Sequence, residues 1–410
     1  MMKKVLLMLF LSSGYFPGFA QNNRSSSVNP NKPLAIKYIG AAKATGGSLA
    51  VVVNELPLAH TSQFLPLNKN GVLVGKNDLD KQMNQVFENV SLALKAAGSN
   101  SEQLVKINIC IAQPELLVKV KENLNTRFKT GKKPAISFVS GDLIHPDALV
   151  GMDVIAVAAS AADKKVKYLK PENLAGPKQQ AQVAVLPAGG VVYVSGQAAK
   201  GKMAEATRET LKQLGATLVH LGLDKSDIVQ IKSFICPASD IRIVEQEMAT
   251  FFAGHTIPPT VYVDWLSNDP VIEIELIAAS PSPQKPAAQM DFITPPGMTA
   301  SPVYSKVTRV NYGKKVYFSS MYGESSGDAK TEVAGIFTEM GQIAKQAGTD
   351  FSHLAKATYY VANDSTSNEL NTIRPKYYKA DRPPAASKAK VKGVGLTGKG
   401  ICIDMIGVCF

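Results

Sequence analysis

The sequence predicts an α+β protein made of three tandem copies of one unit, each a β-sheet with two helices on one face. The main observation is a stripe of apolar residues 11, 8, 4 and 1 positions before a glycine, which occurs before Gly98, Gly222 and Gly348. The same register continues at Leu104, Ile228 and Leu354, at Phe128, Phe252 and Tyr378, and at Pro134, Pro258 and Pro384. Matching spacings without a gap indicate an internal repeat.

Each unit reads as strand, helix, strand, helix and strand. Steps of 3, 4 and 3 draw one apolar face on the first helix, and the glycine suits the left-handed residue that ends it. The strands after it are predicted at Val105–Ile111, Val229–Ile235 and Ala355–Val361, and the last strands at Val150–Ala158, Val271–Ala278 and Ile401–Val408. Upstream, we match Ser48–Val53 with Val191–Gln197 and Lys315–Ser320. This order predicts a sheet with helices on one face.

The predicted boundaries are a signal peptide at residues 1–20 and three units at 30–162, 165–280 and 298–410. The first segment has Lys3 and Lys4, a short apolar run and a small-residue cleavage site, so we expect export to the periplasm or the extracellular space. Linkers are expected near 162–176 and 280–302. Unit 1 diverges most and carries an insertion at 55–76, where Asn70-Gly71 is typical of a hairpin turn.

Composition excludes several classes of protein. With 45% hydrophobic and 19% charged residues the chain is neither disordered nor collagen-like. The net charge of +12 is spread along the chain without aromatic–basic interleaving, so no nucleic-acid partner is expected. Four Cys form no disulfide framework and are predicted to be buried. The five His lack metal-ligand spacing, and no metal, cofactor or membrane partner is expected.

Several segments resemble the RidA (YjgF/L-PSP) family. They are Gly176-Pro177-Lys178, Val192-Tyr193-Val194-Ser195-Gly196-Gln197, Ala206-Thr207-Arg208 and Ile272-Glu273-Ile274-Glu275 in unit 2, and Tyr304-Ser305-Lys306 and Tyr317-Phe318-Ser319 in unit 3. The resemblance implies a chorismate-mutase-like fold, which family members form as homotrimers with ligand clefts between subunits. Three units in one chain would then form an intramolecular pseudo-trimeric barrel, and we expect a monomer.

The resemblance also implies which residues carry the family's enamine and imine deaminase chemistry. The arginine that grips a substrate carboxylate is replaced by Ile136, Thr260 and Ala386. The glutamate that helps to activate water is kept only as Glu273, and its position holds Gly151 in unit 1 and Cys402 in unit 3. The position of a pocket tyrosine is matched to Lys178 and Tyr304.

The expected function is the binding of small carboxylate-type metabolites in clefts between the units, with degenerate deaminase sites. The candidate ligand-binding residues are Lys178, Ser195, Gly196, Thr260, Tyr304, Ser319 and Cys402. One alternative is an enamine or imine deaminase in which Glu273 activates water. The other alternative is a structural or partner-binding protein without a ligand.

Overall fold

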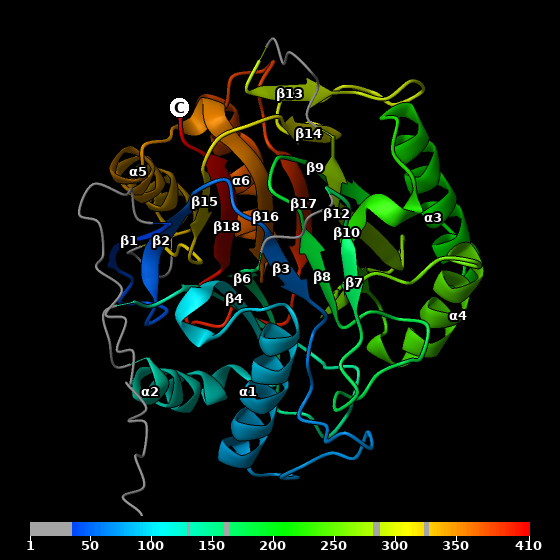
Figure 1. Ribbon diagram of the computed structural model, residues 1–410. Coiled ribbons are helices and arrows are strands. Elements are labelled where there is room, and N and C mark those ends of the chain that lie inside the picture. Colours follow the sequence, from blue (N-terminus) through cyan, green and yellow to red (C-terminus); the bar gives the residue numbers. More distant parts are fainter. Residues whose placement is uncertain (1–34, 129–131, 160–163, 282–287, 324–327) are drawn as a thin grey trace, which may run out of the picture. The chain divides into compact units, whose positions relative to one another are not determined.

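A computed structural model describes residues 35–128, 132–159, 164–281, 288–323 and 328–410 (Figure 1). Residues from Ala35 to Phe410 form one compact unit. The predicted signal peptide lies outside the described residues. In the part of the chain that is described, no helix is long and apolar enough to cross a membrane.

The alternation of strands and helices occurs three times as predicted, with more strands than expected before the first helix and after the second, and we call the copies repeats 1, 2 and 3. Repeat 1 contains β1 (Ile36–Ala41), β2 (Ser48–Val53), β3 (Leu58–Thr61), α1 (Leu79–Ala96), β4 (Leu104–Ile111), α2 (Leu117–Arg127), β5 (Ala135–Ser140) and β6 (Val150–Val157). Repeat 2 contains β7 (Lys167–Leu169), β8 (Val183–Leu186), β9 (Gly190–Gln197), α3 (Met203–His220), β10 (Ile228–Ile235), α4 (Ile241–Phe251), β11 (Thr260–Asp264) and β12 (Ile272–Ser280). Repeat 3 contains β13 (Met290–Ile293), β14 (Val307–Val310), β15 (Lys315–Phe318), α5 (Ala329–Ala347), β16 (Leu354–Val361), α6 (Asp364–Ile373), β17 (Ala385–Lys390) and β18 (Ile401–Val408).

The three repeats share one sheet topology. The strand orders are β5-β4-β6-β3, β11-β10-β12-β9 and β17-β16-β18-β15. The first two strands of each order are parallel, because the second helix of the repeat carries the chain back between them. The other neighbours are antiparallel.

The four strands of each repeat are extended by a strand from another repeat, and the described strands together form one 12-stranded and one 6-stranded sheet. β8 of repeat 2 pairs with β3 of repeat 1, β14 of repeat 3 pairs with β9 of repeat 2, and β2 of repeat 1 pairs with β15 of repeat 3. This pattern corrects the match made from the sequence, because the strand equivalent to Val191–Gln197 is β3 and not Ser48–Val53. Both segments are apolar, so hydropathy alone could not separate them.

Two segments predicted as linkers contain short strands. β7 and β13 pair with β8 and β14, as β1 pairs with β2. Lys167–Leu169 and Met290–Ile293 are edge strands and only partly buried. They are too short for the alternating hydrophobic pattern that marks a strand in a sequence.

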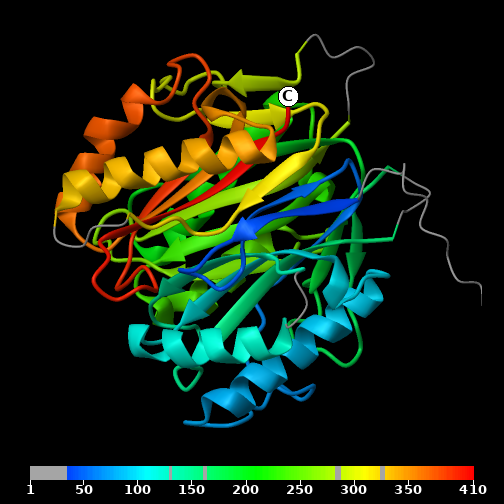
Figure 2. The ribbon, with the colours of Figure 1, turned by 90° about the vertical axis from the view of Figure 1, so that its left-hand side faces the viewer.

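The helices cover one face of each sheet. Figure 2 shows α1 against α2 and α5 against α6, each pair outside the strands. Apolar helix residues such as Met83, Leu214 and Phe337 pack on the strands of their own repeat in three separate core clusters. The opposite faces of the sheets meet in a further cluster to which all three repeats contribute, including Val53, Tyr193 and Val310. Every sheet therefore has both faces buried.

All four cysteines are free thiols. Cys110 and Cys402 are buried as predicted, whereas Cys236 and Cys409 are only partly buried. Both lie just beyond the end of a strand, where the chain leaves the core.

Candidate functional site

Equivalent serines join the repeats at three junctions. Ser195 Oγ donates to the carbonyl of Ser305 and accepts from the backbone N–H of Ala386, with both distances 2.6 Å. The two other junctions repeat this arrangement: Ser62 contacts Ala181 and Thr260, and Ser319 contacts Ser48 and Ile136. The residues that replace the family's arginine, Ile136, Thr260 and Ala386, therefore sit at the junctions.

The candidate residues Ser195 and Ser319 are buried, and their hydroxyls bond to backbone groups of another repeat. The backbone hydrogen bonds beside these serines correct the match that was made for Lys178. The backbone N–H of Ser195 donates to the carbonyl of Lys306, and that of Ser62 donates to the carbonyl of Gln182, which makes Gln180 the equivalent of Tyr304. Lys178 lies two residues earlier. The match made from the sequence was therefore two residues out of register before this strand.

The junction of repeats 2 and 3 contains Glu273. Gly196 is in contact with the Glu273 carboxylate and leaves no room for a side chain, since a Cβ on Gly196 would stand 1.9 Å from Glu273 Oε1. Gly196 N–H donates to Ser387 Oγ at 3.2 Å. Burial, partly offset by a hydrogen bond with Ser387, raises the pKa of Glu273 to about 7. A carboxyl group with that pKa can exchange protons near neutral pH.

The candidate Tyr304 and other polar side chains at this junction are tied to protein partners. Tyr304 Oη accepts from Lys306 Nζ at 2.6 Å, and the ammonium lies over the ring. Lys388 Nζ, two residues after Ala386, donates to Ser367 and Asn371 at 3.1 and 3.3 Å. Arg374 donates to the same Asn371 oxygen at 3.2 Å.

The junction of repeats 3 and 1 contains Cys402. Its side chain is fully buried, and its thiol lies 3.8 Å from Ser320 Oγ and 3.7 Å from the carbonyl of Phe138. Burial raises the pKa of Cys402 to about 12, so the thiol is not ionised near neutral pH. Cys402 therefore has the environment of an inert core cysteine.

The junction of repeats 1 and 2 is open. A cavity of about 200 Å³ lies between the two repeats, with Phe64 and Leu65 of repeat 1 on one side and Thr260 and Tyr262 of repeat 2 on the other. A larger cavity of about 490 Å³, lined by repeat 2 alone, adjoins it, and Gln180, Glu245, Thr260 and Tyr262 line both. Together they offer the volume of a small-ligand site.

Charged side chains line this cleft. Arg242 and Lys178 border the larger cavity only, and both are exposed. Glu245, one turn along α4 from Arg242, is half-buried where the two cavities meet. The Gln180 amide donates to the hydroxyls of Thr260 and Ser62. Sequence reasoning missed Arg242 and Glu245, although their spacing of three residues in a predicted helix places them on one side of it.

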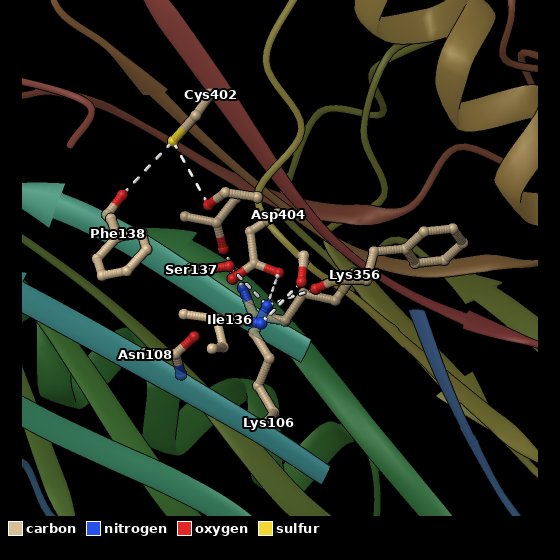
Figure 3. A network of polar contacts seen from close by, with 12 residues as sticks. Lys106, Asn108, Ile136, Ser137, Phe138, Lys356, Cys402 and Asp404 are labelled. Carbon is tan, nitrogen blue, oxygen red and sulfur yellow. Dashed lines mark hydrogen bonds and ion pairs between the residues drawn. The ribbon is translucent and has the colours of Figure 1, made fainter. Parts of the chain in front are cut away.

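A buried polar network lies between the repeats (Figure 3). Lys106 Nζ of repeat 1 contacts Asp404 Oδ1 of repeat 3 at 2.8 Å, and Lys356 Nζ of repeat 3 contacts Glu275 Oε2 of repeat 2 at 2.6 Å. Lys232 of repeat 2 lies 3.7 Å from Glu275 Oε1 and interacts electrostatically with Asp153 of repeat 1. The network surrounds a cavity of about 40 Å³.

The network is balanced, with one lysine and one acid from each repeat. Burial lowers the pKa of Lys106 and of Lys356, and their carboxylate partners oppose this. Burial alone would raise the pKa of Glu275, but Lys356 and Lys232 outweigh it and lower that pKa. The ion pairs thus keep charged groups in the interior. In the described part of the chain, no group of three His, Cys, Asp or Glu could hold a metal ion.

Comparisons with known proteins relate the chain to one family. The family model described as Endoribonuclease L-PSP matches residues 41–158 and 177–280, together more than half of the chain. A human protein named 2-iminobutanoate/2-iminopropanoate deaminase is 27% identical over an alignment of 112 residues, which covers 23% of this chain and 80% of that protein.

Solved structures of single-unit size also match. A Rid-family protein of unknown function from Yersinia pestis, YyfA, is 30% identical and covers 30% of this chain and 100% of its own, with a TM-score of 0.24. A putative endoribonuclease from Thermotoga maritima is 26% identical, covers 30% of this chain and 98% of its own, and also has a TM-score of 0.24.

Proposed function

Because the chain belongs to the RidA/YjgF/L-PSP family, we propose that it binds small carboxylate-bearing metabolites in the cleft between repeats 1 and 2. The observation that carries this proposal is the open cavity beside Thr260, with Arg242 and Lys178 at its wall. Thr260 stands where the family has its carboxylate-binding arginine. Arg242 can supply a guanidinium from α4 instead, and guanidinium groups pair well with carboxylates.

The proposed sites are degenerate as deaminase sites. In the cleft between repeats 1 and 2, the position of the water-activating glutamate is occupied by Gly151, which packs among Leu65, Leu143 and Gln63. A ligand bound in this cleft contacts cationic and amide side chains, but no carboxylate stands at the position of the water-activating glutamate. The cleft therefore favours binding over hydrolysis.

The binding proposal is tested by calorimetric titration with simple carboxylates such as 4-methylpentanoate. We expect saturable binding and a rise in Tm with ligand concentration. Arg242→Gln should weaken binding about tenfold or more, because it removes a charge-assisted contact. The matched control is Arg208→Gln, since Arg208 pairs with Glu247 on the surface outside the cavity. Equal effects of the two substitutions would contradict the proposed role of Arg242.

We also propose that the three repeats close into an intramolecular pseudo-trimeric barrel and that the chain is a monomer. The cyclic pairing of β8 with β3, β14 with β9 and β2 with β15 supports this arrangement. Light scattering should give the mass of one chain. A particle of three chains would overturn the proposal.

Export through residues 1–20 remains a proposal based on their sequence. Expression in a bacterium followed by cell fractionation tests it. We expect a mature protein that begins near Gln21 in the periplasm or the medium, as determined by mass spectrometry. A full-length protein in the cytoplasm would count against it.

The second candidate function is hydrolysis of an enamine or imine at Glu273. The human relative's name supports it, as does the pKa of about 7 on this buried carboxyl group. The Glu273 carboxylate would take a proton from the attacking water, and the products would be a ketoacid and ammonia. With 2-iminobutanoate generated in the assay, the rate should rise with pH towards a plateau above about 7.

Glu273→Gln should abolish any such activity, whereas Glu247→Gln on α4 serves as the control. An unchanged rate in the Glu273 variant would exclude this mechanism. If the parent protein does not accelerate hydrolysis of the imine, binding stands as the function. If the carboxylates also fail to bind in the titration, a structural role is favoured.

A further inference from the structure

The cleft between repeats 1 and 2 has a charge arrangement that identifies a ligand class. We infer that it takes an α-amino acid with an apolar side chain: Glu245 receives the ammonium group, Arg242 and Lys178 face the carboxylate, and the smaller cavity holds the side chain. This inference rests on the proposed binding function of the same cleft and specifies its ligand.

The central observation is the state of Glu245. Its carboxylate is half-buried, lines both cavities, and forms no ion pair or hydrogen bond with any residue that the structure describes. Burial raises the pKa of Glu245, and nearby Arg242 opposes that effect. A half-buried acid facing a cavity is stabilised by a cationic ligand group that enters it.

The acid is specific to this cleft. Glu245 lies seven residues before Phe252, and the equivalent positions in the other repeats, seven residues before Phe128 and Tyr378, hold Lys121 and Asn371. At the same junction the family's inward-facing arginine is replaced by Thr260. This cleft therefore lacks the family's arginine and carries an acid that the two other repeats lack, so a purely anionic ligand is not the best fit.

The two cavities differ in the groups around them. The smaller one has an apolar wall that suits an apolar side chain and polar residues on its other sides, among them Ser62, Gln63 and Asn89; the wall consists of Phe64, Leu65, Leu67, Ile144 and Leu174. The larger one contains both cations, Arg242 and Lys178. Glu245 lies where they meet. An α-amino acid carries an ammonium, a carboxylate and a side chain on one carbon atom, and it can therefore satisfy all three regions at once.

The test compares L-leucine with two fragments that each lack one charged group, 4-methylpentanoate and 3-methylbutylamine. Titration of the full mature chain should show leucine binding at least tenfold more tightly than either fragment. Glu245→Gln should weaken leucine binding at least tenfold and leave 4-methylpentanoate within about twofold. Glu247→Gln is the matched control, because that carboxylate pairs with Arg208 outside the cavities.

The outcomes separate the inference from the proposed function. If 4-methylpentanoate binds as tightly as leucine, or if Glu245→Gln leaves leucine binding unchanged, the amino-acid assignment is overturned while carboxylate binding stands. If neither carboxylate binds, the proposed function itself fails. Circular dichroism of the Glu245 variant, expected to match the parent, ensures that a loss of binding is not a loss of folding.

Discussion

Each junction contains two neighbouring side chains whose sizes compensate one another. In repeat 2, Gly196 leaves the space that Glu273 occupies. In repeat 1, the larger residue is Gln63 and the smaller one is Gly151, and repeat 3 has Ser320 beside Cys402. A close-packed interior requires such compensation, because overfilling forces side chains or backbone to shift. The loss of the glutamate in two repeats is thus a paired change that keeps the junction packed.

The raised pKa of Glu273 predicts a pH-dependent stability. The native carboxyl group binds its proton more tightly than the unfolded one, so its contribution is fully present below about 4.5 and is lost as the pH rises to about 7. The substitution Glu273→Gln removes this pH-dependent loss of stability. We expect the variant to equal the parent in stability near pH 4 and to exceed it by about 1–3 kcal/mol at pH 8.

Urea unfolding at several pH values measures the effect. The change at position 247, Glu247→Gln, should show no such trend. A difference between parent and Glu273 variant that is constant across pH would mean that the carboxyl group titrates alike in the native and unfolded states.

At the scale of elements, glycines at the ends of first helices act as the repeat pattern predicts. Gly98, Gly222 and Gly348 have φ values of 66°, 70° and 76°, in the left-handed region. In α5, Gly348 is the C-cap, and its N–H donates to the backbone carbonyl of Lys345. A side chain is disfavoured there for its backbone conformation alone, because a Cβ on Gly348 would meet nothing within 4 Å.

This geometry predicts opposite effects for two glycine substitutions. Gly348→Ala should destabilise the protein by about 1 kcal/mol, because alanine is strained at positive φ. Gly215→Ala, inside α3, should stabilise it by about 0.5–1 kcal/mol, since the nearest atom to its new Cβ, Phe251 Cε2, is at an ordinary 3.4 Å. Chemical unfolding of both variants checks the signs, and the same sign for both would contradict the assignment.

At the scale of the whole molecule, buried ion pairs connect repeat 1 with repeat 3 and repeat 3 with repeat 2. Lys106 of repeat 1 pairs with Asp404 of repeat 3, and Lys356 of repeat 3 pairs with Glu275 of repeat 2. Removing one member of such a pair leaves an uncompensated buried charge, whereas replacing both members with apolar residues can be nearly neutral. These pairs therefore favour the native arrangement of the three repeats over alternatives that separate the charges.

Lys106→Met should reduce the free energy of unfolding by about 3–5 kcal/mol, because Asp404 loses its partner. The double variant Lys106→Met, Asp404→Leu should recover most of that loss. Denaturant unfolding of the two single variants and the double variant gives the coupling energy. Additive effects would contradict a direct pairing of these two residues.

The repeat spacing by itself determines much of the fold. It predicts the strands at Leu104–Ile111, Ile228–Ile235 and Leu354–Val361 to within one residue, and the last strand of repeat 3 at Ile401–Val408 as observed. These elements carry long periodic patterns that depend only on neighbours in the chain. Glu273, by contrast, is identified through the resemblance of Ile272-Glu273-Ile274-Glu275 to the family.

Only the tertiary structure decides which residues share a junction. Thr260 lies with Gln180 and Glu245 between repeats 1 and 2, whereas Glu273 lies with Ser387 between repeats 2 and 3. Contacts between repeats join residues far apart in the chain, 110 positions in the case of Ser195 with Ser305. Such distances leave no periodicity in the sequence. The same holds for the buried ion pairs of Lys106 with Asp404 and of Lys356 with Glu275, each of which joins two repeats.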